Sequence, residues 1–202
     1  MHAVLEDIAS RFSRELAGLD EGTAQRHPRD LNYIWSIQQV TEHLVLSYRL
    51  TAQVLEDRLR KGHSPRKRRS TLLQRVLRLM VLSFGYLPRG VPACPGTEPV
   101  SGLFPEMDGE CLARQLQTEL RAMDELLDRC RQQFGMEPVA DHPVFGTMRV
   151  DQWRRYHVLH GLHHLEQLRR VREQTAPQAV ASRAFKGILT KELQIPAHRP
   201  LA

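Results

Sequence analysis

The sequence predicts an all-α fold, a four-helix bundle with an extra short helix and long loops. Two observations support this prediction. Apolar residues recur every three or four positions along five stretches of the chain, as they do on the inner face of a helix. No stretch shows the strict alternation of apolar and polar residues that is typical of a half-buried strand. The 202 residues are also enough to enclose a substantial core.

Two helices are predicted in the first third of the chain. The first ends near Gly22, and its apolar residues follow a helical spacing: Val4, Ile8, Phe12, Leu16 and Leu19. The second spans residues 33–59, with Asp30 or Asn32 as its N-cap. Its inward-facing positions are Trp35, Gln39, His43, Leu46, Leu50 and Val54. Gly62 then ends the pattern, because glycine does not favour continuation of a helix.

A third helix is predicted over residues 72–84, with Ser70 or Thr71 as its N-cap. Its apolar residues are Leu73, Val76, Leu77, Met80 and Val81. Residues 85–109 contain five glycines and five prolines, so we expect no helix there. A connection this long is either a lid over a site or a tolerated insertion. Helical spacing resumes over residues 110–134, on Leu112, Leu116, Leu120, Met123, Leu127 and Cys130.

The division of the chain follows from these elements. We expect residues 1–175 to form one helical domain, with a basic loop at 58–70 and a Pro/Gly-rich loop at 85–109. Residues 176–202 are expected to be a C-terminal extension, in which residues 181–193 form a short helix.

The last helix of the bundle, predicted over residues 153–171, contains four histidines within eight residues. At about 100° per residue, His157, His160 and His164 fall within roughly 60° of one another, on a stripe with an apolar residue at each end. His163 points away from this stripe. His160 and His164 lie four residues apart, which is the spacing that lets two imidazole nitrogens reach one ion.

His43, on the second predicted helix, is also expected to face the core. An unpartnered imidazole buried among leucines would be poorly accommodated. If the two helices pack together, His43, His160 and His164 make a site of three nitrogens feasible. The residues alone leave a second interpretation open, in which the histidines bind no ion and line a polar cavity.

The net charge of +6 is concentrated in one tract. Seven basic residues between Arg58 and Arg69 exceed the whole excess, and no aromatic residue lies among them. A nucleic-acid binder usually spreads its cations over a face and interleaves aromatic residues. We therefore expect this tract to be solvated surface and do not expect a nucleic-acid partner.

The N-terminus, the longest apolar run and the cysteines indicate in which cellular compartment the protein is expected. The N-terminus shows no signal-peptide pattern, and the longest apolar-rich run, residues 77–84, is too short to span a bilayer. Cys94, Cys111 and Cys130 show no Cys-x-x-Cys pairing. We therefore expect a soluble cytoplasmic protein with no membrane partner and no cysteine-based zinc site. Cys94 has no basic partner in its loop, so it is not expected to be a nucleophile.

Several motifs, in their order along the chain, resemble those of the DinB-like superfamily, also called the YfiT-type metal-dependent proteins. These are residues 35–44 and, far downstream, residues 160–167. A branch catalogued as a domain of unknown function is more similar still. Its members tend to show His-Pro-x-x-Gly, Gln-Trp and His-x-x-His-His, which here are residues 142–146, 152–153 and 160–164. The likeness runs in patches from about residue 3 to 174.

The resemblance implies a DinB-type four-helix bundle that holds a divalent ion with His43, His160 and His164. His157 stays a fourth candidate ligand or an outer partner. Three neutral histidines suit zinc, nickel or iron and leave coordination positions open. The superfamily includes transferases that use low-molecular-weight thiols, so the resemblance implies thiol transfer; metal-assisted hydrolysis is the second mechanism.

The sequence leaves open whether the site is catalytic, and it identifies no catalytic residue. Glu42 and Glu166 neighbour proposed ligands, but adjacent helical residues point about 100° apart, so both are expected at the surface. Gln39 could orient a ligand or a bound water. The alternative function is a non-catalytic scaffold or interaction module, with a structural metal or none. A small-molecule substrate is one expected partner, and a second copy of the chain, bound through an exposed helix face, is another.

Overall fold

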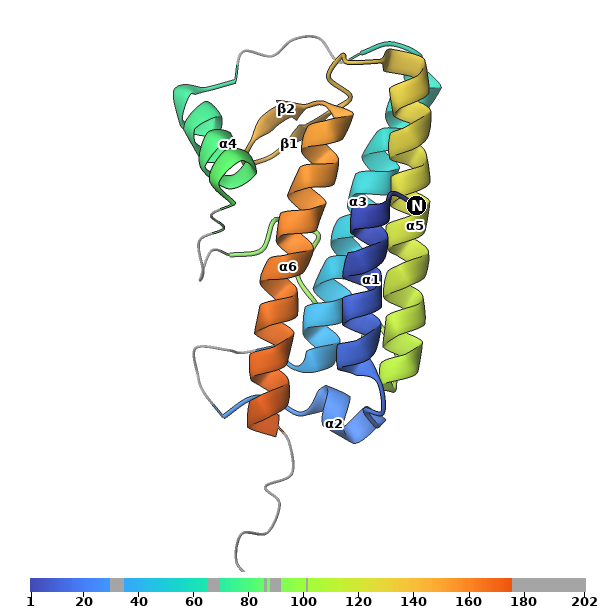
Figure 1. The fold of residues 1–202 in the computed structure, drawn as a ribbon, viewed down its shortest axis with the longest axis vertical. Helices are drawn as coiled ribbons and strands as arrows, with labels where there is room; N and C mark the ends of the chain where they lie inside the picture. Colours follow the sequence, from blue (N-terminus) through green and yellow to red (C-terminus); the bar gives the residue numbers. More distant parts are fainter. Residues whose placement is uncertain (30–34, 65–69, 86, 88–91, 101, 176–202) are drawn as a thin grey trace, which may run out of the picture.

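The computed structural model describes residues 1–29, 35–64, 70–85, 87, 92–100 and 102–175 (Figure 1). This part of the chain is mostly helical, which confirms the predicted all-α fold. Four long helices run side by side: α1 (Ala3–Leu16), α3 (Ile37–Lys61), α5 (Gly109–Phe134) and α6 (Val150–Thr175). A short α2 (Glu21–Gln25) lies at one end, and α4 (Leu72–Phe84) lies outside the bundle beside α6 (Figure 1). None of the helices in the described part is long and apolar enough to cross a membrane.

Some predictions fall outside the described residues. These are the N-caps Asp30 and Asn32, the basic residues at 66–69, and the C-terminal extension with its short helix. The described part of the basic tract belongs to the last turns of α3, where Arg60 and Lys61 form ion pairs with Asp57.

The N-terminal helix is shorter than predicted. α1 ends at Leu16, and Gly18 turns the chain with a φ of 72°, a conformation that glycine adopts without steric cost. Asp20 then caps α2, and its carboxylate accepts a hydrogen bond from the N–H of Thr23. Leu19 is buried and continues the apolar spacing across the break. The prediction of one helix ending near Gly22 is therefore wrong. The apolar spacing continues through the turn, so it does not reveal where α1 ends.

The start of α3 is set by a capping box. The Ser36 hydroxyl accepts from the N–H of Gln39 at 3.2 Å, and Oε1 of Gln39 accepts from the N–H of Ser36 at 3.0 Å. The helix therefore starts at Ile37 and not at residue 33. Oε1 of Gln39 is used in this cap, so this oxygen is not available to orient a ligand or a bound water.

The inner face of α3 also differs from the predicted one. Leu50 and Val54 are each 36% exposed, whereas Leu44, Tyr48 and Leu55 are fully buried. Counting apolar residues does not identify the true inner face of α3, because that face includes small residues with hydroxyl groups. Their hydroxyls donate to backbone carbonyls one turn earlier, which satisfies them inside the core: Thr41, Ser47 and Thr51.

An antiparallel hairpin joins α5 to α6. Its strands are β1 (Ala140–His142) and β2 (Gly146–Met148), so the prediction that the chain has no strand is wrong here. In β1 the residues alternate between buried and exposed, as in a half-buried strand. Three residues are too few for that alternation to stand out in the sequence.

The third predicted helix matches α4 in both bounds, with Thr71 as its N-cap and Gly85 as its C-cap. Its burial does not match, because only Val81 of its residues is buried.

The ends of α1 and α5 approach each other at Gly109. The N–H of Gly109 donates to the Leu19 carbonyl at 2.9 Å. A Cβ atom on Gly109 would lie 1.8 Å from the carbonyl oxygen of Leu16. This contact is with backbone, so a side chain at position 109 would force the two helices apart.

Gly109→Ala should lower the free energy of unfolding by about 1–3 kcal/mol, because overpacking of this kind strains the backbone. Urea unfolding followed by circular dichroism measures the change. Gly22→Ala is the matched control, since Gly22 is also helical and its Cβ would meet nothing closer than 3.6 Å. Equal losses in the two variants would contradict the close approach.

Candidate metal centre

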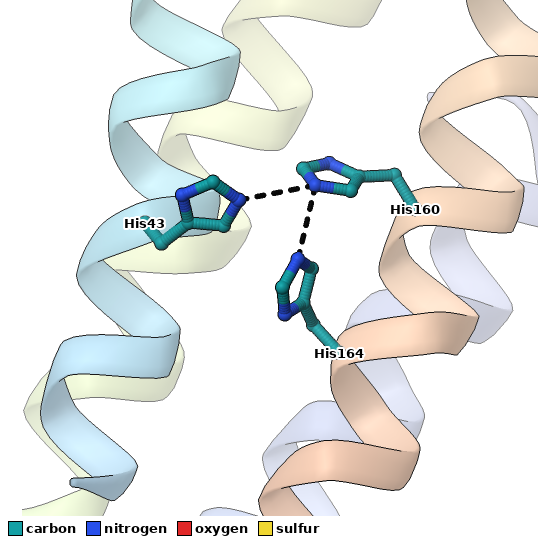
Figure 2. Close-up of side chains that lie close together, drawn as sticks. All are labelled: His43, His160 and His164. Carbon is teal, nitrogen blue, oxygen red and sulfur yellow. Dashed lines mark hydrogen bonds between the residues drawn. The ribbon is translucent and has the colours of Figure 1, made fainter. Parts of the chain in front are cut away.

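Three histidines meet between α3 and α6 (Figure 2). His43 comes from α3, and His160 and His164 come from successive turns of α6. Nε2 of His160 lies 3.1 Å from Nε2 of His43 and 3.0 Å from Nε2 of His164. One nitrogen from each ring lies within 4.8 Å of the others, which is close enough for a single ion to contact all three. The structure thus brings together the three residues that the sequence singled out.

The hydrogen bonds of the outer ring nitrogens orient two of these rings. Nδ1 of His43 lies 2.7 Å from the carbonyl oxygen of Thr97. A carbonyl oxygen only accepts, so Nδ1 carries the proton and Nε2 keeps its lone pair. Nδ1 of His164 donates in the same way to Oε1 of Gln167 at 2.8 Å. Both rings therefore aim an unprotonated Nε2 at the space beside His160, as metal-binding histidines do.

His160 is held by packing. Its ring stacks on Tyr156, with centroids 5.2 Å apart and an angle of 13° between the planes. Nδ1 of His160 is buried and has no hydrogen-bond partner among the described residues. Its Nε2 lies between the two other rings, so His160 is the central member of the cluster (Figure 2).

Burial keeps the three imidazoles neutral. Each residue is at most 7% exposed. Burial is the main cause that lowers the pKa of His43 below its usual 6.5, although the hydrogen bond to Thr97 opposes this effect. Burial also lowers the pKa of His160 and His164 well below 6.5, and neighbouring histidines lower both further. Histidine binds a metal ion only as the neutral imidazole, so burial favours the ligand form.

The spacing and the chemistry of the donors fit a divalent ion. Two nitrogens bound to one tetrahedral zinc ion at about 2.0–2.1 Å lie roughly 3.3–3.4 Å apart. The separations of 3.1 and 3.0 Å from Nε2 of His160 are close to this value, and one nitrogen from each of the three rings lies within 4.8 Å of the others. Three imidazoles suit zinc, nickel or iron better than the oxygen-preferring magnesium or calcium. His43, His160 and His164 are therefore the residues that could hold such an ion.

The other histidines of α6 lie outside this group of three. His157 is fully buried one turn before His160, and its Nε2 lies 3.2 Å from the Thr51 hydroxyl. Its ring also stacks on Trp153, with centroids 5.9 Å apart. His163 is half-buried and packs edge-on against His164. The helical wheel correctly predicted that His157 is buried, but this residue does not belong to the group of three histidines that could hold an ion.

One carboxylate is not where we expected it. Glu42 is 6% exposed and accepts a hydrogen bond from Nε2 of Gln38 at 2.7 Å. Burial raises its pKa. The same Gln38 amide donates to the Pro105 carbonyl, so the Pro/Gly-rich loop covers α3 on this side. The surface position predicted for Glu42 is wrong. Glu166 is exposed, as expected, and it forms an ion pair with Arg170.

The described part of the Pro/Gly-rich loop packs against the histidine cluster. A turn forms where the Cys94 carbonyl accepts from both the N–H and the hydroxyl of Thr97. This turn presents the Thr97 carbonyl to His43. Cys94 itself is half-buried, and burial raises the pKa of its thiol, which disfavours the reactive thiolate. Of the two interpretations of this loop, cover over a site and insertion, the structure favours the first.

Sequence reasoning missed three contributors to the site. Gln167 lies three residues after His164, a spacing at which helical side chains meet, so it could have been found. Trp35 was expected in the core, and its ring packs 5.0 Å from that of His43. Thr97 acts through its backbone carbonyl, which leaves no signal in the sequence.

The fold and the site define the class of protein: a helical bundle with a buried cluster of three histidines that could hold a metal ion. The chain belongs to the family described as a protein of unknown function (DUF1569), whose profile matches residues 10–171. All three histidines of the cluster lie within that span. No curated protein and no solved structure matches the chain. The predicted relation to a domain of unknown function is confirmed, and membership of the DinB-like superfamily stays a prediction.

The stability of the protein should fall below pH 6.5. Burial lowers the pKa of His142 to about 4 and that of His157 to about 3, from 6.5 when unfolded. Between these values the unfolded chain binds protons that the folded chain does not. Each residue should therefore reduce the free energy of unfolding by about 1.4 kcal/mol for every pH unit of acidification.

Urea unfolding at pH values from about 7.5 down to 4.5 measures this slope. His157→Gln should make the slope shallower, and His63→Gln should not, because His63 is exposed. An unchanged slope in His157→Gln would contradict the role given to its burial.

Proposed function

We propose that this protein binds one divalent metal ion, zinc, nickel or iron, through His43, His160 and His164. The convergence of their three Nε2 atoms is the observation that carries the proposal. The Thr97 carbonyl and the Gln167 amide oxygen hold protons on the outer nitrogens of His43 and His164, so their two inner lone pairs both face Nε2 of His160, whose single proton cannot fully satisfy both. Buried polar atoms left in this state are costly, and a bound cation removes the cost.

We further propose that the site is catalytic. Three protein ligands leave at least one coordination position for a small molecule, as in catalytic zinc sites and unlike closed structural ones. When bound, such an ion acts as a Lewis acid and stabilises a bound thiolate or hydroxide. The residues of the chain hold the ion, orient the imidazoles and keep them neutral.

Among the two reactions that suit such a site, transfer of a low-molecular-weight thiol is favoured over hydrolysis. A hydrolase usually places a carboxylate beside the metal as general base. In the described part of the chain, no Asp or Glu belongs to the three-histidine group. Glu42, the nearest carboxylate in sequence, is hydrogen-bonded to Gln38. A metal-bound thiolate is already a nucleophile and needs no such base. We place the protein in the cytoplasm, where such thiols are kept reduced.

The alternative is a structural ion that fastens α3 to α6. The near-complete burial of all three imidazoles favours it, because structural sites are closed to solvent.

Protein purified without a histidine tag should contain close to one metal ion per chain. His43→Ala and His160→Ala should each lose that metal, because two histidines bind a divalent ion far more weakly than three. Elemental analysis by mass spectrometry gives the content, and His63→Ala, which removes an exposed histidine, is the matched control. If the unmodified protein is empty and takes up no zinc, nickel or iron, the proposal fails.

The catalytic and structural alternatives differ in their response to a thiol. In the cobalt-substituted protein, a low-molecular-weight thiol should add a thiolate-to-cobalt absorption band, because the open position accepts the sulfur. A structural site would give an unchanged spectrum, together with a large drop in Tm when the metal is removed. The same titration with His164→Ala reports whether the band depends on this site.

A further inference from the structure

Helix α4 turns its apolar side outward. Six large apolar residues on it are between 41% and 77% exposed: Leu72, Leu73, Val76, Leu79, Met80 and Phe84. At about 100° per residue, they lie within an arc of roughly 140° in which the only polar residue is Ser83. An arc of this kind normally faces a core.

The polar side of α4 is fastened to the body of the protein. The guanidinium of Arg78 donates to the carbonyls of Phe145 at 3.4 Å and Thr147 at 2.9 Å. Nε2 of Gln74 donates to the Pro143 carbonyl at 3.4 Å. All three acceptors belong to the hairpin region between α5 and α6, so the helix cannot roll its apolar side inward without breaking these bonds (Figure 1).

The exposed area is large for a single chain. At roughly 150–200 Å² for a fully exposed side chain of this size, the six exposures amount to about 600 Å². Monomeric proteins rarely leave a contiguous apolar patch above a few hundred Å². Each partner of a standard interface buries about 800 Å², so this patch supplies most of what one side of a dimer needs.

The charge of the patch selects the kind of partner. The centre of a protein–protein interface is depleted of charged residues, and the outward arc of α4 carries none. A helix that lies on an anionic lipid surface is rich in Lys and Arg on its polar face. In the described part of α4 the basic residues are Arg75, at the border of the arc, and Arg78, which bonds to the hairpin region.

We propose that the outward face of α4 is the interface through which two copies of this chain form a homodimer. A two-fold axis through the middle of the helix would place Val76 of each copy against Met80 of the other, because in a symmetric interface residue i contacts residue j and j contacts i. Leu72, Leu73 and Phe84 would cover the ends of the contact, and Arg75 would lie at its polar rim.

Sedimentation equilibrium on the full chain tests the proposal. The unmodified protein should have twice the monomer mass in the micromolar range, and Met80→Glu should be monomeric with an unchanged circular dichroism spectrum. Met136→Glu is the matched control, because Met136 is more exposed than Met80 and lies outside α4. A monomeric unmodified protein, or a Met80→Glu variant that stays dimeric, would overturn the proposal.

A cross-linking experiment covers the case in which Met80→Glu fails to fold. An equimolar mixture of the Val76→Cys and Met80→Cys proteins should form an intermolecular disulfide between them under mild oxidation, and a mixture of the Val76→Cys and Met136→Cys proteins should do so much more slowly. Equal rates would overturn the proposal. A final experiment measures binding of the unmodified protein to vesicles of phosphatidylglycerol. A protein that is monomeric in solution and binds these vesicles would overturn the proposal and identify lipid, and not a second copy, as what covers α4.

Discussion

The burial of three imidazoles between α3 and α6 is the constraint on which the rest of the site depends. Polar nitrogens inside a bundle are costly unless each finds a partner. Two of the outer nitrogens find theirs in the Thr97 carbonyl and the Gln167 side chain. Within the part of the chain that the structure describes, the inner nitrogens find only one another. A divalent cation could satisfy all three at once, and the burial that keeps His43, His160 and His164 neutral keeps them in the form that could hold one.

This constraint links parts of the chain that are far apart. α3 contributes one imidazole, α6 contributes two, and the loop before α5 contributes the carbonyl that fixes the tautomer of His43. The interior around the cluster is accordingly polar for a bundle, with hydroxyls on α3 such as Thr51 and a further buried imidazole, His157, on α6. α3 and α6 therefore serve both the core and the site. α4 contributes Val81 to the buried core, but most of its apolar side faces away from both the core and the site.

The sequence predicted the parts of this arrangement that depend on spacing within one helix. The four-residue interval between His160 and His164 placed them on one face, and the cap at Thr71 and the glycine at 85 predicted both ends of α4. Features that depend on contacts between segments were not predictable. The burial of Glu42 and the outward orientation of α4 are of this kind, whereas the turn at Gly18 was missed because the buried Leu19 continues the apolar spacing across it. An amphipathic pattern reveals that a helix has an apolar side, but not what that side meets.

The central claim is that three imidazoles of this chain share one ion. X-ray absorption spectroscopy of the zinc-loaded protein tests it most directly, because the fine structure reports the atoms around the metal. The account predicts three nitrogens at about 2.0–2.1 Å, with the outer-shell scattering of imidazole rings, and one or more lighter or exchangeable ligands. A first shell dominated by sulfur, or one without imidazole scattering, would contradict the account and place the metal elsewhere.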